Sequence, residues 1–194
     1  MSALDVETDR TGQASAPQRI SNGRSQRLAA AMLIPLATAL TALILLFYVF
    51  FQTGTVNGPS MLPTLQDHDY LLITHGLPVP QRGDIVTIAV VFKGKNEEWV
   101  KRVVAVGGDT VDVAGDVILI NGKPEALPHA TLTNGETKPV EHLTVPAGQI
   151  FVAGDNRGVS EDSRYVGTFP ATAIRGKVVA VYAPIERIRL IPGP

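Results

Sequence analysis

Residues 98–106 read Glu98-Trp99-Val100-Lys101-Arg102-Val103-Val104-Ala105-Val106 and are followed by a Gly-Gly turn. A short run rich in β-branched residues that ends in such a turn is typical of a β-strand. Because side chains alternate between the two faces of a strand, Lys101 and Arg102 point in opposite directions. The face of Lys101 also carries Trp99, Val103 and Ala105. The stretch therefore predicts a strand with one ammonium group on an apolar face.

The same pattern recurs along the rest of the chain beyond residue 53. Strands are predicted at residues 70–74, 84–92, 99–106, 117–120, 149–153 and 177–183. Turns rich in Gly, Asn and Asp separate them, and the Asn121-Gly122 pair between apolar runs is a strong hairpin signal. These features predict a mainly β domain of antiparallel strands over residues 52–194. Residues 124–144 are polar and weak in strand character, and we expect them to form a small cap insertion.

Composition excludes several classes of function. The 194 residues carry 17 Lys and Arg against 18 Asp and Glu, without the basic stripe that nucleic-acid binding needs. There is no cysteine, so disulfides, zinc-thiolate sites and cysteine nucleophiles are excluded. The four histidines have no metal-ligand spacing. We therefore expect no nucleic-acid partner, no metal and no cofactor.

Residues 28–51 contain no charged side chain and are strongly apolar. The run exceeds the roughly 20 residues that a helix needs to cross a bilayer. Aromatic residues crowd its far end, as they do at membrane interfaces. The polar residues that follow offer no good Ala-x-Ala cleavage site. The run therefore predicts a transmembrane anchor helix rather than a cleaved signal peptide.

The charges that flank this run predict its orientation. Arg19, Arg24 and Arg27 precede the run, and the next Lys or Arg after it is Arg82. The positive-inside rule then places the N-terminus in the cytoplasm and residues 52–194 outside the cell membrane, which the chain crosses once. Residues 1–27 are polar and predict a disordered cytoplasmic tail.

A serine lies a few residues beyond the apolar run, in Gly58-Pro59-Ser60-Met61-Leu62-Pro63-Thr64-Leu65. It is either a turn residue or a nucleophile, and a nucleophilic hydroxyl needs a base. Lysine is the available base, because the chain has no cysteine and no histidine in a convincing context. Lys101 on its apolar face would be desolvated, which favours the neutral amine, and Ser–Lys pairs are a known catalytic arrangement. The alternative is a lysine that extends to solvent from an edge strand.

Residues 154–167 form a polar stretch between two apolar segments and carry both signs of charge and two hydroxyls. Such a composition is typical of a loop fixed by internal ion pairs and hydrogen bonds, with a solvated charged loop as the alternative.

Four segments together resemble the sequence motifs of type I (leader) signal peptidases. Residues 60–65 resemble the family's S-M-x-P-T-L motif, and residues 82–86 its R-G-D-[IV]-V motif. Residues 101–109 resemble the K-R-[VI]…G-D motif, and residues 154–164 the G-D-N-R-x-x-S-x-D-S-R motif. They occur in the family's order, after one N-terminal apolar run.

This resemblance implies a membrane-bound serine endopeptidase that removes signal peptides from exported preproteins after Ala-x-Ala-type small residues. Ser60 would be the nucleophile, with its backbone N–H holding the oxyanion, and Lys101 the general base. Ser160 would hydrogen-bond to the lysine amine and orient it. Two ion pairs would support the site, Asp155 with Arg102 and Asp162 with Arg164. Gly58 stands where some members of the family have a serine that adds a second oxyanion donor.

The implied partners are preprotein signal peptides and the lipid bilayer. An extended peptide adds to free strand edges, for which residues 56–58 and 98–100 are the candidates. The predicted substrate-binding residues are Met61, Leu65, Trp99 and Val100, with core packing or membrane contact as the alternative for the first three. Two other functions stay open: a dedicated processing enzyme of a conjugation or secretion system, and a non-catalytic membrane-tethered β-module that binds peptides.

Overall fold

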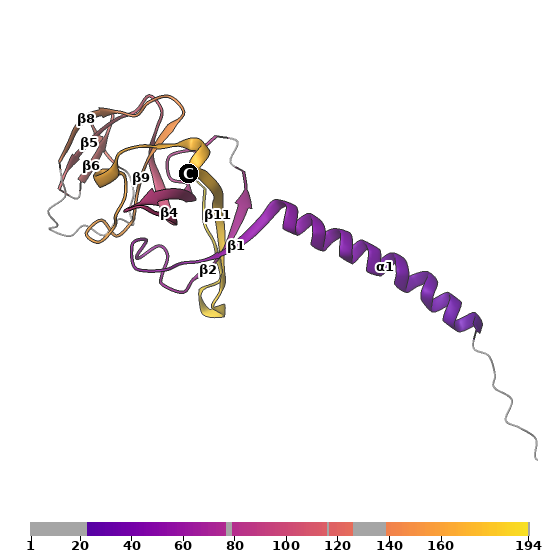
Figure 1. Cartoon of the computed structure of the whole chain (residues 1–194). Coiled ribbons are helices and arrows are strands. Elements are labelled where there is room, and N and C mark those ends of the chain that lie inside the picture. The colour runs from indigo at the N-terminus through magenta and orange to yellow at the C-terminus, as the bar shows by residue number, and fades with distance from the viewer. Residues whose placement is uncertain (1–22, 77–78, 116, 126–138, 194) are drawn as a thin grey trace, which may run out of the picture. The chain divides into compact units, whose positions relative to one another are not determined.

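The computed structural model describes residues 23–76, 79–115, 117–125 and 139–193. These residues fall into two units, one that ends at Ile44 and one that begins at Leu45. The first consists of most of helix α1, and the second contains every described strand (Figure 1). Most of the predicted tail, residues 1–22, lies outside the described residues.

Helix α1 runs over Gly23–Phe50. Its segment Ala30–Phe50 has a mean hydropathy of 2.4 and no buried part, so its length and composition suit a membrane span. The helix begins earlier than predicted, and residues 23–27, assigned to the tail, are helical, because extending an existing helix costs little. It also ends one residue before the predicted anchor does, since Phe51 pairs with Thr74 as the first residue of a strand.

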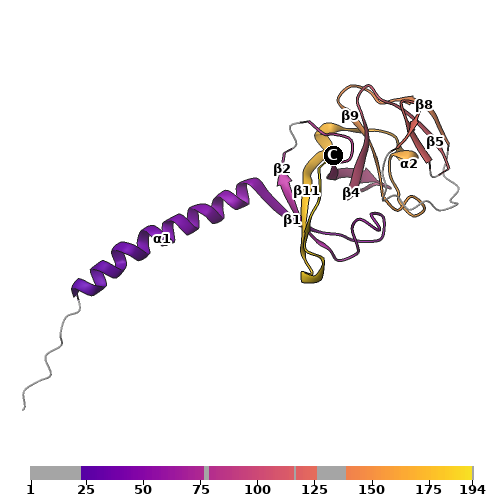
Figure 2. The ribbon, with the colours of Figure 1, turned by 180° about the vertical axis from the view of Figure 1, so that it is seen from behind.

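Twelve strands, all paired antiparallel, form two sheets among the described residues. The larger has the order β1-β2-β11-β3-β4-β9-β10, with β12 on β11, and the smaller β7-β6-β5-β8. Strands of the larger sheet are β1 Phe51–Thr55, β2 Tyr70–His75, β3 Ile85–Phe92, β4 Lys95–Val106, β9 Gln149–Ala153, β10 Phe169–Pro170, β11 Ile174–Ala183 and β12 Arg189–Leu190. Strands of the smaller sheet are β5 Thr110–Ala114, β6 Val117–Ile120, β7 Lys123–Pro124 and β8 Val140–Thr144. Figures 1 and 2 both place β5 and β8 on the side of the folded unit away from β1 and β2.

The predicted mainly β fold is confirmed, and each of the six predicted strands is present. Short helical turns join some of them: α2 Ser163–Val166, η1 Ala171–Ala173 and η2 Ile185–Arg187. The Asn121-Gly122 hairpin is also present, with both residues at positive φ as a type I′ turn requires. Lys93 and Gly94 have the same left-handed backbone and form the turn between β3 and β4, which begins at Lys95.

The weak strand character predicted for residues 124–144 does not hold at the two ends of this segment. Residues 126–138 lie outside the described residues, but Pro124 belongs to β7 and residues 140–144 form β8, which pairs with β5. The side chains of Val140 and Leu143 pack against buried residues of the smaller sheet. The two residues are three positions apart and reach the same cluster because the register between β5 and β8 shifts between Val111 and Val113, where β8 has one extra residue.

Three clusters of buried residues form the core. The first contains Val56, Met61, Leu65, Leu71, Ile73, Ile85, Val178 and Val181. The second contains Val86, Ile88, Val90, Val103, Ile150 and Val152, with Trp99 packed against it. The third contains Val104, Ala105, Val111, Val113, Ile118, Ile120, Val145, Phe151 and Ala153. Strand β4 contributes to all three, because Val100 packs against the first.

The face alternation predicted for β4 holds up to Val103 and then fails at Ala105. The register between β4 and β9 shifts between Val103 and Ala105. Such a bulge inserts an extra residue on one strand and re-aims the side chains that follow. Ala105 consequently packs in the same cluster as Val104, not with Trp99 and Val103.

The larger sheet predicts an intolerant glycine in β11. A Cβ at Gly176 would lie 2.3 Å from the Thr74 carbonyl oxygen and 2.5 Å from Ile73 Cγ2. We expect Gly176→Ala to lower the free energy of unfolding by about 1–3 kcal/mol, the usual cost of overpacking. Thermal unfolding of the full chain in detergent measures this.

Gly193→Ala is the matched control, because its Cβ would meet nothing nearer than Lys177 Nζ at 3.8 Å. It should change stability by less than about 0.5 kcal/mol. Equal stability of Gly176→Ala and the wild type would contradict the strand packing described here.

Candidate active site

Ser60 and Lys101 meet across the larger sheet. Ser60 lies in the connection between β1 and β2, and Lys101 lies in β4, between β3 and β9. Lys101 Nζ is 2.9 Å from Ser60 Oγ, within hydrogen-bond distance. The lysine is only 5% exposed. The two residues singled out from the sequence are therefore in direct contact.

Both side chains line a cleft with a volume of about 590 Å³. Its other walls are Asn57, Glu97, Glu98, Trp99, Val159 and Glu161. The Lys101 ammonium lies 5.5 Å from the centroid of the Trp99 ring. The hydroxyl thus opens on a space large enough for a peptide, while the lysine has an aromatic ring as its neighbour.

Burial lowers the pKa of Lys101 below its ordinary value of 10.5. The Asp162 carboxylate opposes this fall in pKa, and the Arg164 guanidinium reinforces it. Glu161 opposes it more weakly. Desolvation is the largest of these effects, and it favours the neutral amine. A neutral amine at this distance can accept the proton of the Ser60 hydroxyl, which is the first step of nucleophilic catalysis.

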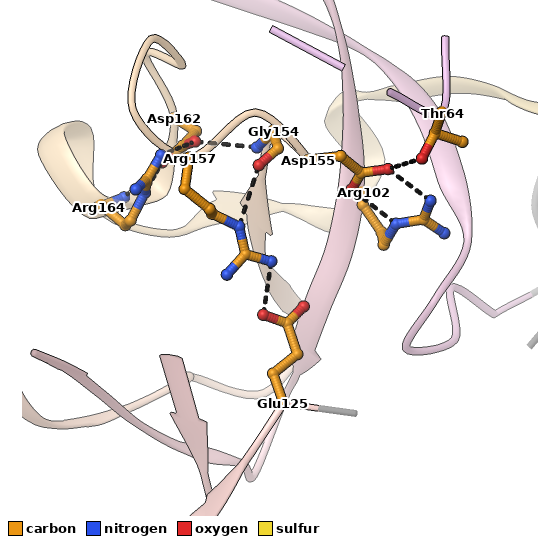
Figure 3. Close-up of polar contacts among 8 residues, drawn as sticks. All are labelled: Thr64, Arg102, Glu125, Gly154, Asp155, Arg157, Asp162 and Arg164. Carbon is orange, nitrogen blue, oxygen red and sulfur yellow. Dashed lines mark hydrogen bonds and ion pairs between the residues drawn. The ribbon is translucent and has the colours of Figure 1, made fainter. Parts of the chain in front are cut away.

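Arg102 points away from the cleft, as predicted, and forms the predicted ion pair with Asp155. Its Nε and Nη2 donate to the two Asp155 oxygens at 2.8 and 2.6 Å, and its Nη1 donates to the Gly83 carbonyl at 2.8 Å. The Thr64 hydroxyl donates to the same carboxylate at 2.5 Å (Figure 3). Asp155 therefore connects β4 to the segment that carries the nucleophile.

The second predicted ion pair is also present. Arg164 Nε and Nη2 donate to Asp162 at 2.8 and 2.9 Å, and both side chains are buried. The Asp162 carboxylate also accepts from the Arg164 backbone N–H, as the N-cap of α2, and from the Gly154 N–H at 2.9 Å. One carboxylate thus fixes both ends of the loop between β9 and α2.

Gly154 is the point where this loop touches the nucleophile. A Cβ at this position would lie 2.2 Å from Ser160 Oγ and 2.5 Å from the Ser60 carbonyl oxygen. The Asn156 N–H donates to that same carbonyl at 3.0 Å. The backbone of Ser60 is therefore held by close packing on Gly154 and by a hydrogen bond from Asn156.

Ser160 does not make the predicted hydrogen bond to Lys101. Its side chain is buried against Gly154, and among the described residues its hydroxyl has no hydrogen-bond partner. The Ser160 hydroxyl instead occupies the space beside Gly154 where a Cβ of that residue would lie. The structure brings it close to the nucleophile's loop but does not join it to the base.

Three of the predicted substrate-binding residues do not line the cleft. Met61 and Leu65 have no exposed surface and pack in the first core cluster, and Val100 packs against that cluster. The alternative of core packing holds for Met61 and Leu65, because the turns after Ser60 direct these apolar side chains inward. Trp99 does line the cleft.

The two candidate strand edges differ. Residues 98–100 of β4 pair with β3 on one side, while β9 pairs with β4 only from Arg102 onward, so no described strand covers the other side. Val56 is already bonded through both its backbone groups, to Asp69 and His68, and the Gly58 N–H donates to Asp67. The β4 edge is thus the one that remains free.

Several side chains that support the site were not predicted. Thr64 and Arg157 lie inside the motifs quoted above, so their position in those motifs was a usable signal. The others come from distant segments: Glu125 binds Arg157, Arg187 pairs with Asp69, and Arg189 donates to the Thr64 carbonyl. No local pattern marks them, because each contact exists only once the chain has folded. Within the described ranges, no cluster of three or more His, Asp or Glu side chains could hold a metal ion.

Comparison with known proteins identifies the family. The family model "Signal peptidase, peptidase S26" matches residues 27–183. Signal peptidase I of Bacillus amyloliquefaciens is 34% identical over 168 residues, 80% of this chain and 88% of that protein. Signal peptidase IB of Staphylococcus aureus (strain Mu50) is 30% identical over 180 residues, 81% of this chain and 91% of that protein. A crystal structure of a signal peptidase I from Enterococcus faecalis V583 is 29% identical with a TM-score of 0.42, and covers 53% of this chain and 98% of that one.

The chain belongs to the signal peptidase family, peptidase S26, whose members are serine peptidases. The resemblance drawn from four motifs is confirmed, and family membership supports the cleavage of signal peptides.

The contact at Gly154 leads to a prediction about the rate of cleavage. Gly154→Ala would force a Cβ into the Ser60 carbonyl and the Ser160 hydroxyl and so displace the nucleophile. A misplacement of about 1 Å can cost about 100-fold in rate. We expect kcat on a preprotein substrate to fall by about that factor in the full-length enzyme.

Gly176→Ala serves as the control, since it overpacks the sheet against β2 rather than against Ser60. At a temperature where both variants are folded, it should keep the wild-type kcat. Unchanged kcat in Gly154→Ala would mean that the loop does not position the nucleophile.

Proposed function

We propose that the chain is a membrane-anchored signal peptidase that cleaves with a Ser60/Lys101 dyad after Ala-x-Ala-type small residues. The observation that carries the proposal is the 2.9 Å contact between a buried lysine amine and a serine hydroxyl in an open cleft. The lowered pKa of Lys101 supports its role as the base. No second candidate function has an observation of its own in its favour.

The reaction begins with the transfer of the Ser60 proton to neutral Lys101. Ser60 Oγ attacks the carbonyl carbon of the scissile peptide bond, and the carbonyl oxygen becomes an oxyanion. Among the described residues no group accepts a hydrogen bond from the Ser60 backbone N–H, which leaves it available to stabilise that oxyanion.

The protonated lysine then gives its proton to the departing amine, and the signal peptide stays bound as an ester of Ser60. Lys101, neutral again, takes a proton from water as the water attacks this ester. The protonated lysine returns this proton to Ser60 Oγ as the ester bond breaks, which leaves free Ser60 and a signal peptide with a new carboxyl end. The same lysine thus acts as base and acid in each half of the reaction.

The substrate would bind as a strand on the free edge of β4 at residues 98–100, beside Trp99. Backbone hydrogen bonds along an edge supply affinity independent of sequence, and pockets for alternate side chains supply the choice of small residues. This mode of binding presents the scissile carbonyl to Ser60 at the end of the strand.

Segment Ala30–Phe50 of α1 would anchor the enzyme, and only a few residues separate it from Ser60. Arg24 and Arg27 before the segment favour a cytoplasmic N-terminus and a catalytic unit outside the cell membrane. The nucleophile would then work at the height where a membrane-inserted signal peptide leaves the bilayer.

The dyad is tested by removing each of its members. Ser60→Ala lacks the nucleophile and Lys101→Met lacks the base, so we expect each to lose cleavage of a preprotein by a factor of about 1,000 or more. The assay uses the full chain in detergent and follows the mature product by gel. Cleavage by either variant at the wild-type rate would rule out the dyad.

The pH dependence of cleavage tests the base separately. Because Lys101 acts in its neutral form, log(kcat/KM) should rise with pH and level off above the pKa of the free enzyme's lysine. Burial lowers that pKa, so the midpoint should lie below 10.5. A profile that is flat from acid to alkaline pH would exclude a lysine base.

A further inference from the structure

The loop of the active site is joined to the smaller sheet by a buried ion pair that the mechanism does not use. Arg157 Nη2 donates to Glu125 Oε2 at 2.6 Å, and the Arg157 and Glu125 side chains are 2% and 9% exposed. Glu125 directly follows β7, and its backbone N–H donates to the Ile118 carbonyl in β6. The carboxylate is therefore anchored in the smaller sheet, while the guanidinium belongs to the loop between β9 and α2.

Arg157 also contacts Gly154, the glycine that packs on the nucleophile. Its Nε donates to the Gly154 carbonyl at 3.1 Å, and Figure 3 shows the guanidinium between Gly154 and Glu125. The Gly154 N–H is held on its other side by Asp162. The backbone groups of Gly154 are thus both held by buried charged side chains: Asp162 accepts from its N–H, and Arg157 donates to its carbonyl.

Stability alone does not account for such a pair. Burying two charges is costly, and apolar side chains of similar volume often stabilise a protein as well or better. Glu125 Oε1 is buried without a hydrogen-bond partner among the described residues, which adds to the cost. The pair instead fixes the orientation of the Arg157 side chain, because the planar guanidinium can bond to Glu125 and Gly154 only in one orientation.

We propose that Arg157 and Glu125 are a positioning pair for the peptidase reaction: they tie the smaller sheet to Gly154 and thereby hold Ser60 at its distance from Lys101. The inference rests on the proposed dyad. Glu125 fixes the position of the Arg157 guanidinium, and this guanidinium fixes the Gly154 carbonyl by a hydrogen bond. Gly154 in turn holds the backbone of Ser60 by direct contact. Neither member of the pair lines the cleft, so substrate binding should not depend on them directly.

The test uses the full chain in detergent with a preprotein substrate and two kinds of variant. The double variant Glu125→Leu/Arg157→Met removes both charges and keeps apolar volume, so the fold should survive with a melting temperature close to that of the wild type. Arg157→Lys keeps the positive charge but lacks the fork that binds Glu125 and Gly154 together. We expect kcat to fall about 10-fold or more in both, with KM within about 2-fold, as for a nucleophile slightly out of place.

Arg82→Met is the matched control. Arg82 forms an ion pair with Asp109, which also accepts from Asn121 beside the smaller sheet, but this pair does not touch Gly154. The control should keep the wild-type kcat even if it loses some thermal stability. An equal fall of kcat in Arg82→Met would show that any lost contact near the smaller sheet has this effect, and would overturn the proposal.

Two further results would also overturn it. One is a wild-type kcat in either folded variant, the double variant or Arg157→Lys. The other is a fall of kcat that merely follows the folded fraction and disappears at lower temperature. Ser60→Ala separates this inference from the dyad itself: if Ser60→Ala is inactive while the Arg157 and Glu125 variants are fully active, only the positioning role fails. If Ser60→Ala cleaves normally, the dyad fails first.

Discussion

A lysine amine that is kept from water is the constraint on which the rest of this structure depends. Lys101 is buried beside Trp99, and burial lowers its pKa. Between the lowered pKa of the folded state and the ordinary pKa of the unfolded state, the unfolded chain binds more protons, so the stability of the fold rises with pH across that interval. Below it, the buried amine opposes folding. The surrounding contacts must offset this cost while leaving the amine free to meet Ser60.

Strand β4 achieves both through two consecutive residues. Lys101 projects into the cleft, and Arg102, on the opposite face, binds Asp155 with two hydrogen bonds. Asp155 in turn accepts from Thr64, four residues after the nucleophile. The base, Lys101, and the Arg102 side chain that holds the nucleophile's segment through Asp155 therefore lie on one stretch of backbone. Neither can shift along the sheet without the other.

Sequence reasoning predicted the local features well. The alternation in β4 separated Lys101 from Arg102, and the Asn121-Gly122 turn marked a hairpin. The resemblance to signal peptidases implied two ion pairs that are present. It failed where a feature depends on the assembled fold. The bulge after Val103 follows from the pairing with β9, and the contact of Glu125 with Arg157 joins segments 32 residues apart. Met61 and Leu65 were assigned to the cleft because apolar residues suit a pocket and a core equally, and only the path of the chain separates the two.

The unpaired side of β4 has a consequence beyond substrate binding. A strand with open hydrogen-bonding groups can pair with the same strand of another copy, which is a route to aggregation. Here the open stretch begins with Glu98 and is preceded by Glu97, and both are exposed. If two copies paired antiparallel about Glu98, this residue of one copy would stand directly opposite Glu98 of the other on the same face, and like charges in that position repel. An edge of this kind can accept an uncharged, extended peptide while it resists pairing with the same edge of another copy of the protein.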